Sequence, residues 1–392
     1  MKQTNININS TNYYNNELLR IIKGALDLDV DKVRNYTVFL ADKIEQEGDK
    51  FTAERLRKVL NGSDHQLKPT GVKFAEPVPV DAESRFPLIE RVELKNIDEQ
   101  PIILLPEQWE IVNEFLNISK SHALLDSEGI GGSVSLLMCG PPGTGKSRLA
   151  RHIAKELKME LYIARLDGLI SSLLGSTSKN IRALFDFASK RPCILFLDEF
   201  DAIAKLRGDS LEMGELKRVV NSFIQNLDSF GTQSIILAAT NHEGLLDSAV
   251  WRRFSYRLEF SFPNNQLRKQ MWSQFIKPIE FNNRDLELLV DLSEGFSGSD
   301  IQEVCRRLQR RQITMKDGSN LKDAFQILRN ISIGEGEERR FLSSFRGQDS
   351  RQIAIALNNR NKKLYNNDSL AKLIGTTYIM AYRWTREGGK TS

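Results

Sequence analysis

One short stretch of the chain has the residue types and spacing that bind phosphate groups. It reads Gly140-Pro141-Pro142-Gly143-Thr144-Gly145-Lys146-Ser147. Glycines let consecutive backbone N–H groups turn toward an anion. Lys146 can reach the β- and γ-phosphates of a nucleotide, and the hydroxyl of Ser147 can bind Mg²⁺. The stretch therefore predicts a nucleotide-binding site, and a glycine-rich turn that arose by chance is the alternative.

The residues on either side of this loop predict the elements that hold it. Residues 134–139 form a short, mostly apolar run that suits a buried strand, and residues 147–154 have apolar side chains at helical spacing. A helix that begins directly after the loop presents its positive N-terminal end to a bound phosphate. This order of strand, loop and helix favours nucleotide binding over a chance turn.

Two carboxylates follow a second apolar run. Residues 194–197 are Ile-Leu-Phe-Leu, and Asp198 and Glu199 come next. In parallel α/β sheets, ligands bind at the carboxyl ends of the strands. At that position Asp198 would hold Mg²⁺ through water, and Glu199 would act as the general base that polarises the attacking water. The alternative is an acidic pair on the surface. The phosphate-binding loop earlier in the chain favours the functional interpretation over this alternative.

Further polar groups follow the next apolar runs. Asn241 ends the run 234–241, where its side chain could hydrogen-bond the γ-phosphate or the water. Arg252 and Arg253 lie in the run 246–254, and arginine is the residue that stabilises charge developing on a transferring phosphoryl group. These residues fit the hydrolysis of a nucleotide.

The composition is typical of a soluble protein, since 40% of the 392 residues are hydrophobic and 27% are charged. No apolar run approaches the length of a membrane span. Residues 1–16 lack the apolar core of a signal peptide, and we expect a disordered tail there. The three cysteines are odd in number and far apart, which argues against a disulfide framework or a zinc site. They favour a reducing, cytoplasmic location.

Apolar spacing and proline positions predict the organisation of the N-terminal part. Residues 13–62 show helical spacing, interrupted at Gly48, which predicts a three-helix module within residues 1–62. Residues 63–102 are expected to be a linker, because their prolines prevent long helices. The N-terminal helices could dock a partner or serve as scaffolding.

Five motifs occur in an order and spacing that one family uses. They are GPPGTGKS, ILFLDEFD, IILAATN, LLDSAVWRRF and GFSGSDI. In these motifs the chain resembles the AAA family of ATPases, over about residues 103–332. The resemblance implies an α/β fold with a P-loop parallel sheet in a nucleotide-binding domain at 103–262, followed by a helical lid at 263–333.

The resemblance also implies an activity and the residues that serve it. It implies ATP hydrolysis in a ring, usually a hexamer, with ATP and Mg²⁺ at each interface. Arg252 and Arg253 would be arginine fingers that act on the neighbour's ATP, Asn241 would be sensor 1, and Gly298 would lie beside the adenine. An arginine of the sensor-2 type is missing at the last motif, which places the chain nearer the AAA clade proper than the replication initiators or clamp loaders.

One stretch departs from the family pattern. The family's substrate-gripping loop carries an aromatic residue, a hydrophobic residue and glycine, whereas this chain has Leu173-Leu174-Gly175. A leucine in the aromatic place offers less contact area than a ring. We therefore do not expect strong unfolding of a polypeptide by this loop, and simple packing of both leucines is the alternative.

The C-terminal module, residues 334–392, is basic. Residues 339–392 contain 11 Lys/Arg and 3 Asp/Glu, a net charge of +8. Residues 368–375 predict a short helix that ends at Gly375, and residues 378–386 predict a second helix after a brief turn. With a supporting helix at 351–357, this resembles the helix-turn-helix of bacterial DNA-binding proteins. The charge supports DNA binding, and the alternative is a helical module that packs on the ring or on a partner.

Together these features predict a cytoplasmic ATPase ring that remodels a macromolecular client. The client is expected to be protein, in the service of a separately encoded effector such as a subtilisin-like protease. One alternative is an ATPase that acts on DNA, or is recruited by it, through residues 334–392. Another is an ATP-gated switch that hydrolyses slowly and recruits partners. No membrane partner is expected.

Overall fold

The computed structural model describes most of the chain. The described residues are 14–27, 29–62, 78–81, 85–97, 101–130, 134–166, 174–202, 213–230, 235–242, 244, 248–314, 320–331 and 341–388. The chain divides into two compact units. The first unit comprises Met1–Ile102, Pro106–Gly140 and Lys146–Glu259, and the second comprises Ile103–Leu105, Pro141–Gly145 and Phe260–Ser392.

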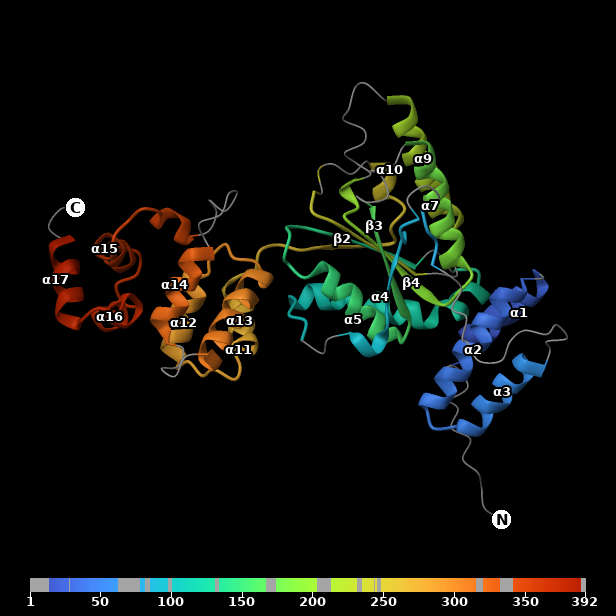
Figure 1. The fold of residues 1–392 in the computed structure, drawn as a ribbon, viewed down its shortest axis with the longest axis horizontal. Coiled ribbons are helices and arrows are strands. Elements are labelled where there is room, and N and C mark those ends of the chain that lie inside the picture. The colour runs from blue at the N-terminus through green and yellow to red at the C-terminus, as the bar shows by residue number, and fades with distance from the viewer. Residues whose placement is uncertain are drawn as a thin grey trace, which may run out of the picture. The chain divides into compact units, whose positions relative to one another are not determined.

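A sheet lies at the centre of the first unit (Figure 1). Its strands within the described residues are β1 (Glu90–Val92), β2 (Val134–Cys139), β3 (Glu160–Arg165), β4 (Cys193–Asp198), β5 (Ile235–Thr240) and β6 (Tyr256–Glu259). They lie in the order β1-β3-β4-β5-β2-β6. Strand β1 runs antiparallel to β3, and the remaining neighbours pair in parallel. The side chains of β2 and β5 are buried throughout, which suits parallel strands covered on both faces. The predicted α/β fold with a parallel P-loop sheet is confirmed.

The helices of the first unit within the described residues are α1 (Asn15–Leu26), α2 (Val30–Gln46), α3 (Lys50–Gly62), α4 (Pro106–Ser127), α5 (Lys146–Leu157), α7 (Leu174–Ser189), α9 (Met213–Ser229) and α10 (Ser248–Trp251). In Figure 1, α4 and α5 lie on one side of the strands, and α7 and α9 lie on the other. The ring of Phe200, which follows β4, packs edge to face on Phe223 of α9 at 5.3 Å between centroids. This contact anchors the turn that carries the two carboxylates.

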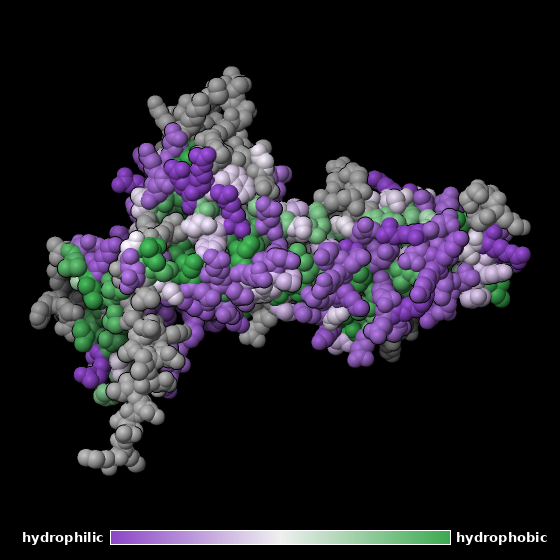
Figure 2. Space-filling model, turned by 180° about the vertical axis from the view of Figure 1, so that it is seen from behind, coloured by the Kyte–Doolittle hydropathy of each residue, from purple (hydrophilic) through white to green (hydrophobic). Residues whose placement is uncertain are grey.

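The N-terminal helices α1, α2 and α3 form a small module. Their apolar core consists of Leu40, Ala41, Ile44 and Ala53. The amide of Asn35 in α2 donates a hydrogen bond to the backbone carbonyl of Lys190 at 3.2 Å, which ties the module to the rest of the first unit. Large apolar side chains that remain exposed on α1 and α3 include Leu18, Leu19, Ile22, Leu26, Phe51 and Val59. Figure 2 shows an apolar area over these helices.

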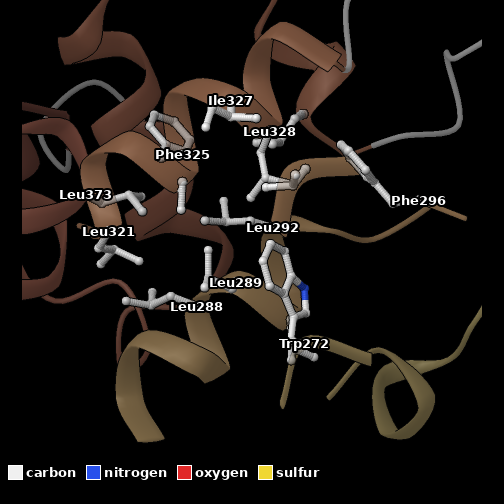
Figure 3. Close-up of a cluster of buried hydrophobic side chains, with 14 of the residues drawn as sticks. Trp272, Leu288, Leu289, Leu292, Phe296, Leu321, Phe325, Ile327, Leu328 and Leu373 are labelled. Atoms are coloured by element: carbon white, nitrogen blue, oxygen red, sulfur yellow. The ribbon is translucent and has the colours of Figure 1, made fainter. Parts of the chain in front are cut away.

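The second unit is helical. Its helices are α11 (Asn265–Phe275), α12 (Asn283–Leu292), α13 (Gly298–Thr314), α14 (Leu321–Ile331), α15 (Ser350–Arg360), α16 (Asn367–Ile374) and α17 (Tyr378–Gly388), with a short 3-10 helix at Phe341–Phe345. One apolar core runs from Trp272 in α11 through Phe325 in α14 to Leu373 in α16 (Figure 3). The helices that follow residue 333 therefore share the core of the helices that precede it.

Local sequence sets where these helices begin and end. Side chains of Asn264, Asn282 and Asn366 each accept a hydrogen bond from a backbone N–H in the first turn of α11, α12 and α16. Asp349 forms a reciprocal capping box with Gln352 at the start of α15. These caps satisfy backbone groups that the helix leaves without partners.

Candidate nucleotide-binding site

The predicted phosphate-binding loop joins β2 to α5. Gly140, Gly143 and Gly145 have φ angles of 138°, 76° and 112°, a region that side-chain-bearing residues rarely adopt. The N–H of Gly140 donates to the carbonyl oxygen of Thr240 at 3.3 Å, so the first residue of the loop is tied to the end of β5. Three glycines at this spacing therefore let the backbone make a turn that other residues would resist.

Lys146 is the first residue of α5, and its side chain is buried, with 7% of the residue exposed. Its Nζ donates to the carbonyl oxygen of Gly140 at 2.7 Å. Burial lowers the pKa of Lys146 to about 8, and the carboxylate of Asp198 acts in the opposite direction. A cation held at low solvent exposure interacts more strongly with a phosphate than one in water does.

Ser147 and Asp198 come together beside this lysine. The Ser147 hydroxyl donates to Oδ2 of Asp198 at 3.2 Å, and Oδ1 of Asp198 accepts the N–H of Glu199 at 3.0 Å. A hydroxyl and a carboxylate are the hard oxygen ligands that Mg²⁺ prefers, and Mg²⁺ usually keeps several waters beside one or two such groups. The donor set therefore fits a magnesium ion.

Glu199 lies at the end of β4 with an exposed side chain and a φ of 54°. A non-glycine residue in this left-handed region is uncommon, and such strain is concentrated at functional sites. The backbone on its far side is held, because Phe200 N–H donates to the carbonyl of Ala239 in β5 at 2.8 Å. Glu199 is therefore held directly after Asp198 at the end of β4.

Asp201 was not singled out from the sequence, although it closes the acidic run Asp198-Glu199-Phe200-Asp201. Only 5% of it is exposed, and its Oδ1 accepts hydrogen bonds from the Thr240 hydroxyl and the Asn241 N–H, both at 3.4 Å. These bonds tie the turn after β4 to the end of β5. The signal available in the sequence was a third carboxylate that follows a buried strand at a short interval.

Arg252 and Arg253 follow α10 but differ in their contacts. Arg253 donates from Nε to Oδ1 of Asp228 at 2.9 Å and from Nη2 to Oδ2 at 3.2 Å. This hydrogen-bonded pair raises the pKa of Arg253. Arg252 is exposed and has no ion pair with any residue that the structure describes. The two arginines are thus not equivalent within one subunit.

Gly298 opens α13 in the second unit, where it lies against the loop residue Gly143. The N–H of Ser299 donates to the carbonyl of Gly143 at 3.0 Å. A side-chain carbon added to Gly143 would lie 2.6 Å from the hydroxyl oxygen of Ser297. Two motifs that are far apart in the sequence therefore meet so closely that Gly143 has no room for a side chain.

Two further expectations concern other parts of the chain. Leu173 of the expected substrate-gripping loop lies outside the described residues, and α7 begins at Leu174, so the role of that loop stays a prediction. Among the residues that the structure describes, no helix is long and apolar enough to cross a membrane.

A parallel sheet with a glycine-rich loop after β2 and an acidic turn after β4 defines a P-loop nucleotide-binding domain. Residues 136–262 match the family model described as "ATPase family associated with various cellular activities (AAA)". The chain is 32% identical over 314 residues to the "Uncharacterized AAA family ATPase y4kL" of Sinorhizobium fredii, an alignment that spans 77% of this chain and 92% of that protein. The chain belongs to the AAA family of ATPases, and it is an ATP-binding, ATP-hydrolysing enzyme.

Two further relatives and one solved structure are also similar to the chain. A "Proteasome-activating nucleotidase" of Saccharolobus islandicus is 30% identical, over 68% of this chain and 70% of that protein. An "ATP-dependent zinc metalloprotease FtsH" of Parabacteroides distasonis is 35% identical, over 45% of this chain and 27% of that protein. A solved structure titled "Crystal structure of FIGL-1 AAA domain" matches with 24% identity and a TM-score of 0.49, over 62% of this chain and 85% of that one. Proteins of the AAA family typically assemble into rings.

Proposed function

We propose that the chain forms a ring, in the hexameric form usual for the family, and uses ATP hydrolysis at the subunit interfaces to remodel a protein client. The observation that carries this proposal is the grouping of Lys146, Ser147, Asp198 and Glu199 at one edge of the sheet. It brings together a desolvated cation, two oxygen ligands and an exposed carboxylate. A nucleotide phosphate with its metal ion requires these groups.

Each residue of this group has a proposed part in hydrolysis. The backbone of residues 140–145 and the Lys146 ammonium bind the phosphates of ATP, and Ser147 and Asp198 hold Mg²⁺. When bound, Mg²⁺ neutralises charge on the β- and γ-phosphate oxygens. The Glu199 carboxylate accepts a proton from the attacking water as general base. Asn241, at the end of β5, orients that water or the γ-phosphate by hydrogen bonding.

The ring adds an arginine from the neighbouring subunit. The exposed Arg252 is the finger that reaches the neighbour's ATP, because within the described residues it has no carboxylate partner of its own subunit. Arg253 is the second finger of the pair, and its hydrogen bonds to Asp228 hold the segment that carries both. Gly298 is proposed to lie beside the adenine, next to the loop residue Gly143.

The client is proposed to be protein on the strength of the named relatives. One of them is a proteasome-activating nucleotidase and another is an ATP-dependent metalloprotease. We propose by analogy that this ATPase works in the cytoplasm, with a separately encoded effector that acts on the client.

ATP turnover of the purified protein tests this proposal, measured with and without an unfolded polypeptide. We expect the polypeptide to stimulate turnover. Replacing Glu199 with Gln should lower kcat by about 10²- to 10⁴-fold while nucleotide binding is kept, because a general base contributes about that much. Glu160→Gln, which alters a carboxylate at the first residue of β3, is the matched control and should leave kcat unchanged. Full activity of the Glu199→Gln protein would refute the assignment of the base.

A further inference from the structure

The last three helices have an arrangement that the ATPase site does not require. Helices α15, α16 and α17 pack together over an apolar centre, whose members include Ile353, Leu357, Leu370, Leu373 and Ala381. Helix α16 ends at Ile374 and is followed by Gly375, which has a φ of 76°, and α17 begins three residues after this glycine. The Thr377 hydroxyl oxygen accepts the N–H of Met380 at 3.3 Å at the start of α17. Two helices joined by a short glycine turn and braced by a third form a helix-turn-helix arrangement.

One face of α17 is turned outward. Tyr378, Ile379 and Tyr382 are 56%, 67% and 45% exposed. Arg383 and Arg386 are exposed next to them, and neither forms an ion pair with any residue in the described part of the chain. On the opposite face Ala381 is fully buried. The outward face thus carries aromatic, aliphatic and cationic groups over two helical turns.

The rotation of α17 is set by its polar contacts. The Thr385 hydroxyl donates to Oδ1 of Asn367 in α16 at 3.0 Å. At the C-terminal end, Arg351 of α15 pairs with Glu387 at 2.7 Å. These contacts fix which side chains α17 presents outward.

The charge of these helices favours a polyanion as the partner. Residues 341–388 contain eight Lys/Arg and three Asp/Glu, a net charge of +5. The three acidic groups are engaged locally: Asp349 caps α15, Asp368 lies 3.5 Å from Lys372, and Glu387 pairs with Arg351. The carboxylates therefore do not neutralise Arg383 and Arg386.

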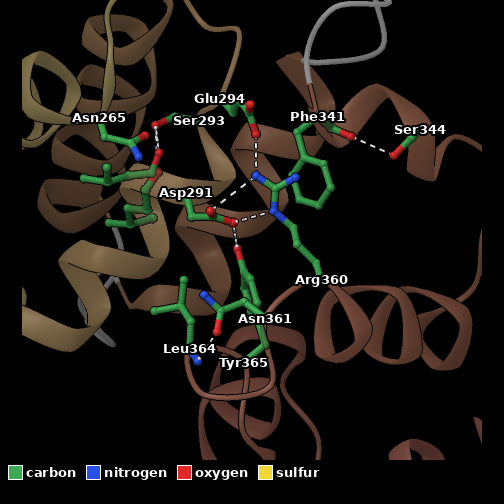
Figure 4. Close-up of polar contacts among 12 residues, drawn as sticks. Asn265, Asp291, Ser293, Glu294, Phe341, Ser344, Arg360, Asn361, Leu364 and Tyr365 are labelled. Carbon is green, nitrogen blue, oxygen red and sulfur yellow. Dashed lines mark hydrogen bonds and ion pairs between the residues drawn. The ribbon is translucent and has the colours of Figure 1, made fainter. Parts of the chain in front are cut away.

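The helices are also held firmly on α12 (Figure 4). Asp291 accepts hydrogen bonds from Nε of Arg360 at 3.1 Å and from the hydroxyl of the fully buried Tyr365 at 2.5 Å. Arg284 donates to the Ser369 hydroxyl oxygen at 2.9 Å, and Glu294 pairs with Arg360. A charged network of this kind, together with the shared apolar core, presents α17 as a preformed surface, which lowers the entropy cost of binding.

We propose that the outward face of α17, carrying Tyr378, Ile379, Tyr382, Arg383 and Arg386, binds duplex DNA in the major groove. An α-helix fits that groove, arginine pairs with guanine edges or phosphates, and apolar groups contact thymine methyl groups. The second helix of a helix-turn-helix binds in this way. DNA binding by α17 is a function beyond the proposed remodelling activity. It does not depend on that activity, because it is expected in the absence of nucleotide.

Fluorescence anisotropy of the full-length protein with a labelled duplex tests the proposal. The probe is a mixed-sequence DNA of about 30 base pairs, long enough for two or more helical turns. We expect binding at about 0.05 M salt that weakens as salt rises. The double variant Arg383→Ala/Arg386→Ala should raise Kd about tenfold or more, and should reduce the slope of log K against log salt by about 2. Tyr382→Ala, which leaves the charge intact, should weaken binding without changing that slope.

The control variant removes the same charge from elsewhere on the second unit. Lys269→Ala/Arg310→Ala alters two exposed basic residues of α11 and α13 and should keep the wild-type Kd. An RNA duplex of the same sequence should bind more weakly, because its major groove is too narrow for a helix. Absence of DNA binding, equal losses in the two double variants, or equal binding of RNA and DNA would each overturn the proposal. ATP turnover of the same variants reports separately on the remodelling function.

Discussion

The buried Asp201 offers a sharp test of how the site is positioned. Its Oδ1 lies 3.4 Å from the Thr240 hydroxyl oxygen and 3.4 Å from the Asn241 backbone nitrogen. Both bonds are long, and each contributes on the order of 0.5–1 kcal/mol. Asp201→Ala removes the single oxygen that accepts both bonds, and so weakens the connection between the turn after β4 and the end of β5. A displacement of Asn241 by about 1 Å is enough to slow catalysis by up to about 10²-fold.

We therefore expect Asp201→Ala to lower kcat by about 10- to 100-fold. The affinity for ATP should change by less than about threefold, because Lys146 and Ser147 are untouched. Steady-state kinetics and binding of a fluorescent ATP analogue measure the two quantities. Asp201→Asn keeps an oxygen acceptor and the side-chain shape, so its kcat should be intermediate.

A double-mutant cycle decides whether Asp201 acts through Asn241. If it does, the Asp201→Ala/Asn241→Ala protein has the same kcat as Asn241→Ala alone. Once the Asn241 side chain is removed, the loss of Asp201, which positions it, has no further effect. Thermal unfolding of each variant verifies that the fold is retained. Losses that add fully in the double variant, or a folded Asp201→Ala protein with normal kcat, would refute the positioning role.

Two further predictions concern the arginines and the lysine. Arg252→Ala should lower kcat about 10³-fold or more in the assembled protein, because loss of an arginine finger has an effect of this size. Asp228→Asn should lower kcat less. Measuring kcat at several protein concentrations distinguishes a direct role of a residue in hydrolysis from an indirect role through assembly. Equal effects of both changes would contradict the inequivalence of Arg252 and Arg253. Burial lowers the pKa of Lys146 to about 8 in the protein without nucleotide, whereas bound phosphate favours the charged form. ATP affinity should therefore be constant below about pH 8 and fall above it, measured by titration at several pH values; a flat profile to pH 9 would contradict the lowered pKa.

Much of the fold was predictable because it depends on local sequence. The strands at residues 134–139 and 194–197 were expected from short apolar runs, and they are present as β2 and β4. Helices within residues 13–62 were expected from apolar spacing and are present as α1, α2 and α3. The turn at Gly375 was expected because glycine tolerates a positive φ, and its φ is 76°.

Other features could not be predicted, because they join residues that are distant in the chain. Asp201 bonds to the end of β5 because β4 and β5 are neighbours in the sheet. The order of strands along the chain does not show which strands are neighbours. The different contacts of Arg252 and Arg253 depend on Asp228, which lies at the end of α9. No local pattern distinguishes two adjacent arginines.

The sequence alone determined the class of this protein, since phosphate binding requires glycines, a lysine and carboxylates at set intervals along the chain. It also determined the order of the elements, because apolar spacing and capping residues act over a few residues. Only the tertiary structure decided that Gly143 lies against Ser297, that Asp291 joins Arg360 and Tyr365, and that one face of α17 is left outward. Such contacts arise when helices and strands pack to bury apolar area, and that packing is a property of the whole chain.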